Sequence, residues 1–163
     1  MNCARSIDGG HLVAEPDGPH RHGDAVFAIQ RPGKVRIFTL HEAETLLPLV
    51  RFITAQAHDT LAPVLESMQA RMHHHEALSQ QEKRYEAIVQ RWINKMERLG
   101  VVVSGLWLLD FDTGDGYLCW RHPEMALGFY HGYNQGFGQR RPLPEILRER
   151  QPGWATSDEG KAP

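Results

Sequence analysis

The sequence predicts an α+β domain in which a long antiparallel helical hairpin precedes a small three-stranded antiparallel β-meander. From Leu40 to Leu99, apolar residues recur every three or four positions, which is typical of amphipathic helices. After Gly100 the period changes to two, within short runs rich in β-branched and aromatic residues. Turn sequences separate these runs, so consecutive strands should pair with one another.

Local signals predict where the helices begin and end. The T-L-H-E sequence from Thr39 to Glu42 is a capping box, in which the threonine hydroxyl and the glutamate carboxylate each accept a backbone N–H. The S-Q-Q-E sequence from Ser79 to Glu82 has the same pattern and predicts the start of the second helix. Gly100 predicts its end, because glycine readily adopts the left-handed conformation. Pro48 and Pro63 lie inside the first helical pattern and predict bends or a break.

Three β-rich runs follow the helices. They are Leu106 to Phe111, Tyr117 to Arg121 and Ala126 to His131. A turn with two glycines, from Asp112 to Gly116, separates the first two runs, and the H-P-E sequence from His122 to Glu124 separates the last two. The apolar face of this meander should cover the helical hairpin.

Composition bounds the class of protein. The chain has 163 residues, which suits one domain at residues 35–150 with a flexible N-terminal extension at residues 1–34 and a flexible C-terminal tail at residues 151–163. Its formal net charge of −2 gives no reason to expect nucleic acid or a membrane surface as a partner. Two cysteines, no signal peptide and no membrane-spanning run indicate a soluble, cytoplasmic protein.

The segment from Tyr117 to Pro142 combines aromatic, thiol, imidazole and carboxylate side chains and is the candidate site. Cys119, Glu124 and His131 are possible ligands for a divalent transition metal. A turn centred near Glu124 would place Cys119 opposite Phe129 and Tyr117 opposite His131, with Cys119 and His131 on one face. Glu124 would then lie on the order of 13 Å from His131, so the two do not share an ion unless the strand folds back or a second subunit contributes. The pattern favours a buried cysteine and a hydrogen-bonded histidine over a metal site.

The glycine-rich end of this segment is the second candidate. Its glycines let backbone amides turn toward a ligand, and Arg140 and Arg141 are able to hold a small carboxylate or phosphate. We expect them to converge with His131 and Tyr130 on one cleft. In the alternative interpretation, the arginines pair with Glu145 or Glu149 and the glycines only permit tight turns.

Five blocks of the sequence resemble the bacterial domain-of-unknown-function 2203 family, over roughly Arg36 to Leu143. The blocks are R-I-F-T-L-H-E-A-E-T-L-L-P-L-V, E-R-L-G-V, L-L-D-F, L-C-W-R and G-F-Y-H-G-Y-N-Q-G-F-G-Q-R-R-P-L. The resemblance implies a shared fold, assigns no activity, and marks Glu124, His131 and Arg140 or Arg141 as matching polar positions. The family usually has acidic residues after the histidine, where this chain has Gly132, Asn134 and Gln135.

Two functions follow as hypotheses. The first is a non-enzymatic binding or interaction module whose Gly/Arg-rich segment takes a small anionic ligand or a protein partner. The alternative is a metal-dependent enzyme that uses His131 with Cys119 or Glu124. In either case we expect a homodimer through the helical hairpin, because a small sheet leaves part of two helices uncovered. Phe52, Ile53 and Tyr85 lie at the edges of the apolar stripe and are candidate contacts.

Overall fold

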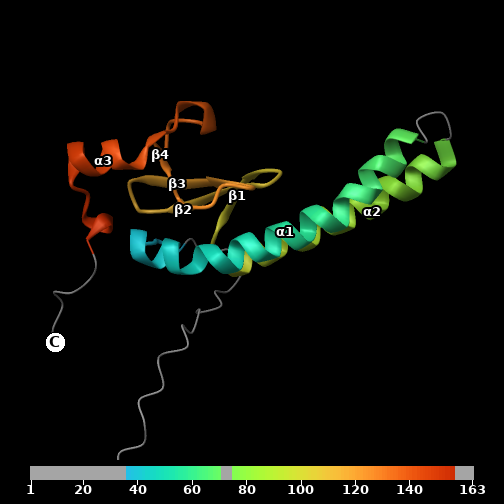
Figure 1. Cartoon of the computed structure of the whole chain (residues 1–163), viewed down its shortest axis with the longest axis horizontal. Helices are drawn as coiled ribbons and strands as arrows, with labels where there is room; N and C mark the ends of the chain where they lie inside the picture. The colour runs from blue at the N-terminus through green and yellow to red at the C-terminus, as the bar shows by residue number, and fades with distance from the viewer. Residues whose placement is uncertain (1–35, 71–74, 157–163) are drawn as a thin grey trace, which may run out of the picture.

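The computed structural model describes residues 36–70 and 75–156, which form two long helices, a sheet and a short C-terminal helix (Figure 1). The predicted α+β fold with a helical hairpin is confirmed. The extension expected at residues 1–34 lies outside the described residues. In chain order the elements are α1 (Leu40–Ala70), α2 (His75–Arg98), β1 (Val102–Gly105), β2 (Leu108–Asp112), β3 (Gly116–Arg121), β4 (Phe129–Gly132), the 3-10 turn η1 (Phe137–Gln139), β5 (Arg141–Pro142), α3 (Leu143–Arg150) and the 3-10 turn η2 (Gly153–Ala155).

Helix α1 begins at the predicted capping box. The backbone N–H of Glu42 donates to Thr39 Oγ1 at 3.2 Å, and the N–H of Thr39 donates to Glu42 Oε2 at 2.9 Å. The helix then continues to Ala70 through both Pro48 and Pro63, so of the bends or break expected there, the break is absent. Both prolines are exposed, and water is therefore available to the carbonyl groups that lose their helical partners.

Helix α2 begins earlier than its sequence pattern predicts. It starts at His75, which places Ser79 inside the helix, and the second capping box is therefore wrong. Its other end is as predicted. Gly100 has φ +78°, its N–H donates to the carbonyl of Glu97, and the N–H of Val101 donates to the carbonyl of Met96, both at 3.0 Å. This pair of bonds closes the last turn around a left-handed glycine.

The sheet is antiparallel and has five strands in the order β1-β2-β3-β4-β5, two more than predicted. One extra strand, β1, lies before the run expected as the first strand, because the chain turns between Gly105 and Leu108, with Trp107 at φ 64°, and pairs Val102 and Val103 with β2. The other, β5, pairs with β4 after the glycine-rich segment returns the chain to the sheet edge. The predicted register between β3 and β4 is confirmed, with Tyr117 opposite His131 and Cys119 opposite Phe129.

The two faces of the sheet differ in chemistry. Alternation along the strands directs one set of side chains into the hydrophobic core with α1 and α2, namely Leu109, Phe111, Leu118, Trp120 and Tyr130. The other face carries Asp110, Asp112, Cys119 and His131, all of which are nevertheless buried. We call this second side the outer face. Buried polar groups on a sheet face away from the core need a specific explanation.

The packed domain continues past the Arg150 boundary that the sequence suggests. Pro152 and Trp154 are buried, and the Trp154 ring stacks on that of Tyr130 with centroids 5.4 Å apart. The segment through Ala155 is therefore part of the core rather than of a tail. In the described part of the chain, no helix has the length and apolar character needed to cross a membrane.

Candidate metal centre on the outer face of the sheet

Three potential metal ligands meet at the centre of the outer face. Asp110 on β2 is directly paired with Cys119 on β3, and His131 on β4 lies on the same face, two residues along from the partner of Cys119. One ligand atom from each residue lies within 4.8 Å of the other two. Gly116 allows this close approach of β3 and β4, because a Cβ there would lie 2.6 Å from the backbone oxygen of His131.

The imidazole of His131 is held in a defined orientation. Its Nδ1 lies 3.0 Å from the carbonyl oxygen of Gly132, and its Nε2 lies 3.5 Å from Asp110 Oδ1. A carbonyl only accepts, so Nδ1 carries the proton and the lone pair of a neutral ring is on Nε2. The ring of Tyr117, whose centroid lies 5.3 Å away, packs against the imidazole. The imidazole nitrogen that is able to bind a cation therefore faces the carboxylate of Asp110.

Asp110 and Cys119 complete the cluster. Asp110 is 5 % exposed, and the hydroxyl of Ser104 donates to its second oxygen, Oδ2. Cys119 is fully buried, and burial raises the pKa of its thiol well above the usual range, with the nearby Asp110 carboxylate raising it further. A thiol with a raised pKa is a poor nucleophile. Ser104 contacts a carboxylate rather than an imidazole, so neither side chain has the activated geometry of acyl-transfer enzymes.

Glu124, which the sequence offers as a metal ligand, lies elsewhere. Its Oε1 accepts a hydrogen bond from Arg140 Nη1 at 2.9 Å, and its Oε2 accepts one from the backbone N–H of Arg121 at 2.9 Å. The cluster with Cys119 and His131 therefore has Asp110 in the place proposed for Glu124. The signal for Asp110 was present in the L-L-D-F sequence, where one carboxylate interrupts an otherwise apolar strand.

The residues proposed for anion binding are not brought together. Arg140 lies over the rings of Phe129 and Phe137, each 4.0 Å from its guanidinium carbon, and pairs with Glu124. Arg141 pairs with Glu149 on α3, with its Nη2 2.6 Å from Oε1.

Tyr130 belongs to the core. Its hydroxyl donates to the backbone oxygen of Asp115 at 3.0 Å, and burial, followed by the nearby Asp115 carboxylate, raises its pKa to about 12. Arg141 is the strand partner of Tyr130, and these two residues face away from His131. Of the proposed residues, only Arg140 shares the outer face with His131.

Comparisons with known proteins support one relationship. A family model described as an uncharacterized conserved protein (DUF2203) matches residues 36–143, which include α1, α2, all five strands and every member of the Asp110, Cys119 and His131 cluster. No curated protein and no solved structure matches the chain. The match covers well over half of the sequence, and the chain therefore belongs to the DUF2203 family of uncharacterized conserved proteins.

Proposed function

We propose that this protein binds one divalent transition-metal ion, with a carboxylate oxygen of Asp110, the thiolate of Cys119 and Nε2 of His131 as ligands. The observation that carries the proposal is the meeting of three ligand atoms within 4.8 Å of one another. Metal–ligand bonds of about 2.0 to 2.3 Å in a tetrahedral site separate the ligand atoms by roughly 3.3 to 3.8 Å. The distances between the ligand atoms therefore need to shorten by about 1 Å on metal binding, and rotation of the three side chains is able to supply this.

The ligand types favour zinc, ferrous iron or cobalt over magnesium and calcium. A thiolate and an imidazole suit borderline and soft ions, whereas hard ions prefer an all-oxygen set. The hydrogen bonds of His131 and Asp110 also suit metal binding. The bond from His131 Nδ1–H to the Gly132 carbonyl leaves Nε2 free for the ion, and the Ser104 hydroxyl orients the Asp110 carboxylate. A cation would also offset the cost of burying a carboxylate and a thiolate side by side.

Three protein ligands leave one coordination position for water or a small ligand. Such sites are typical of metals that take part in chemistry, whereas structural zinc sites usually have four protein ligands. An aromatic pair borders the cluster, because Tyr117 packs against His131 and contacts the ring of Tyr133, with centroids 5.1 Å apart. Metal binding with one exchangeable position is the function that the geometry supports best.

The anion site expected from Arg140 and Arg141 has weaker support. Each guanidinium group already pairs with a carboxylate, and an incoming anion would have to displace Glu124 or Glu149. Each charge-assisted bond from an arginine to the new anion would therefore replace one to a glutamate, with little net gain.

A competition titration tests the metal proposal. Untagged, metal-free protein is titrated with Zn²⁺ against a chromogenic chelator, in a background where His73, His74 and His75 are glutamine so that they do not contribute. We expect one ion per chain, and a loss of affinity of about 100-fold or more in Asp110→Asn, Cys119→Ser and His131→Gln. Glu124→Gln is the matched control and should bind as the parent does.

Circular dichroism of each variant separates loss of a ligand from loss of fold. A parent protein that does not compete with a chelator of micromolar affinity would refute the proposal. Equal loss in Glu124→Gln and His131→Gln would refute the assigned ligand set.

A further inference from the structure

The outer half of the helical hairpin extends beyond the sheet as a two-helix arm (Figure 1). A small cluster of its own holds this arm together, in which Leu61 and Val64 of α1 pack against Ile88 of α2. This cluster is separate from the main core that joins the sheet to the inner half of the hairpin. Two helices in contact bury one stripe each, so their remaining faces are open to a third helix.

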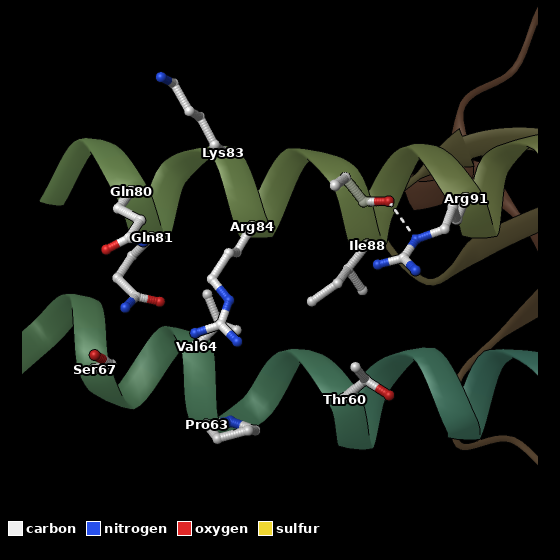
Figure 2. Close-up of a pocket in the computed structure, with 11 residues that line it drawn as sticks. Thr60, Pro63, Val64, Ser67, Gln80, Gln81, Lys83, Arg84, Ile88 and Arg91 are labelled. Carbon is white, nitrogen blue, oxygen red and sulfur yellow. Dashed lines mark hydrogen bonds between the residues drawn. The ribbon is translucent and has the colours of Figure 1, made fainter. Parts of the chain in front are cut away.

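One open face of the arm is hollowed along the line where α1 and α2 meet. Two adjoining hollows of about 510 Å³ each share Thr60, Ile88 and Arg91, and together they form a continuous groove. Figure 2 shows the outer hollow, with Ile88 and Val64 directed into the space between the helices. Trp92 and Ala57 line the inner hollow. Apolar side chains from both helices thus lie along the floor of the groove, with polar ones among them.

The α2 side of this groove is basic. Arg84, Arg91 and Lys95 line it, at spacings of seven and four residues that keep them on one side of the helix over about three turns. Within residues 36–70 and 75–156, none of the three forms an ion pair. Figure 2 shows Arg84 directed toward α1 across the groove, while its neighbour Lys83, which also borders the outer hollow, points away from α1.

A buried acceptor lies in the same hollow. Gln81 is 8 % exposed, and its Oε1 has no hydrogen-bond donor among the described residues. An unpaired buried carbonyl is costly, and a donor from a bound partner would relieve that cost. Gln81 lines the outer hollow together with Arg84. The groove therefore combines an apolar floor, unpaired positive charge and an unsatisfied acceptor.

We propose that this groove binds an amphipathic helix of another protein, with an apolar stripe for the floor and acidic residues that face Arg84, Arg91 and Lys95. Charge complementarity selects this occupant, because the residues that line the two hollows include four basic side chains and one acidic one, Asp59. A second copy of the chain fits less well, because its own groove carries the same excess of basic side chains and supplies no row of acidic ones. The proposal is independent of the metal site.

Fluorescence anisotropy with a labelled synthetic peptide tests the proposal. The probe is a helical peptide of about 18 residues with leucines every three or four positions and glutamates along both flanks. A second peptide with lysine in place of each glutamate is the charge control. We expect saturable binding of the glutamate peptide, weakened by rising salt, and binding of the lysine peptide at least about tenfold weaker.

Charge reversal on the protein locates the contact. Arg84→Glu/Arg91→Glu should weaken binding of the glutamate peptide by at least about tenfold, whereas Arg148→Glu, an exposed position on α3 that lines neither hollow, should change it by less than about twofold. Arg84→Gln/Arg91→Gln should give an intermediate loss if the reversed variant folds poorly. Equal losses in Arg148→Glu and the double variant would overturn the proposal, as would the absence of saturable binding. A dimer in light scattering that the double variant dissociates would assign the groove to a second copy and would also overturn it.

Discussion

Replacing Trp154 by alanine should destabilise the whole domain, although this residue lies near the end of the chain. Trp154 is 8 % exposed, its ring stacks on Tyr130, and its Nε1–H donates to Asp115 Oδ1 at 2.8 Å. The hydroxyl of Thr113 donates to the same oxygen at 2.8 Å, and the hydroxyl of Tyr130, which donates to the backbone oxygen of Asp115, lies 3.2 Å from it. Trp154 thus ties the C-terminal turn to the β2–β3 turn and to β4.

The expected magnitude follows from the buried area and the hydrogen bond. Burial of roughly 200 Å² of tryptophan surface at about 25 cal/mol per Å² corresponds to about 5 kcal/mol. Alanine keeps part of that burial and water is able to refill part of the site, so the loss for Trp154→Ala should be about 3 to 4 kcal/mol. Trp154→Phe keeps the stack on Tyr130 and loses the hydrogen bond, and should cost about 1 kcal/mol or slightly more.

Urea denaturation followed by circular dichroism measures these free energies of unfolding. Gly153→Ala is the matched control, because a Cβ at that position meets no atom within 4 Å, and its stability should change by less than about 0.5 kcal/mol. A loss below about 1 kcal/mol for Trp154→Ala, with an unchanged denaturant slope, would refute the reasoning and return these residues to a loosely attached tail.

Two further predictions concern the hairpin. Partial burial alone would raise the pKa of Glu42, but hydrogen bonds from Thr39 and the charge of Arg36 outweigh it and lower the pKa below 4.5. The stability that this charge contributes is therefore fully present at neutral pH and is lost as pH falls through the lowered pKa. The difference in free energy of unfolding between the parent and Glu42→Gln, expected at about 0.5 kcal/mol at pH 7, should shrink below pH 4.5, and a constant difference would contradict this. We also propose that the hairpin forms a homodimer through the face that carries Phe52, which is 60 % exposed. Phe52→Asp should then convert a dimer to a monomer in light scattering, and a monomeric parent at concentrations on the order of tens of micromolar would rule it out.

Patterns that depend on neighbouring residues could be read from the sequence. The capping box at Thr39 and the left-handed Gly100 were predictable because a few local bonds determine each. The opposition of Tyr117 and His131 was predictable because a turn near Glu124 fixes the pairing of the two strands it joins.

Features that depend on tertiary contacts could not be predicted in this way. Ser79 has the sequence of a helix start, yet α2 already extends past it, since packing against α1 stabilises more of the helix than its capping signals indicate. Trp154 lies in a polar segment of the sequence. It is buried because its ring stacks on Tyr130 and its indole N–H bonds to Asp115, and both partners are distant in the sequence. Asp110 could not be assigned as a ligand from the sequence, because an apolar run around a carboxylate predicts a strand but not the side chains opposite it.

Side chains alternate between the two faces of each strand, so a change in the volume of the core is able to move the ligands of the proposed metal site. Asp110 lies between Leu109 and Phe111, and Cys119 lies beside Trp120, so each proposed ligand shares its backbone with residues packed against the helices. Metal sites tolerate changes in bond length of only about 0.2 Å, which is smaller than many backbone shifts that follow core substitutions. Conservative exchanges at Leu109 or Phe111 are therefore a means to alter ion preference without touching a ligand. A library of such repacked variants, sorted by whether they retain zinc, cobalt or iron, would show which core substitutions change the ion that the site binds.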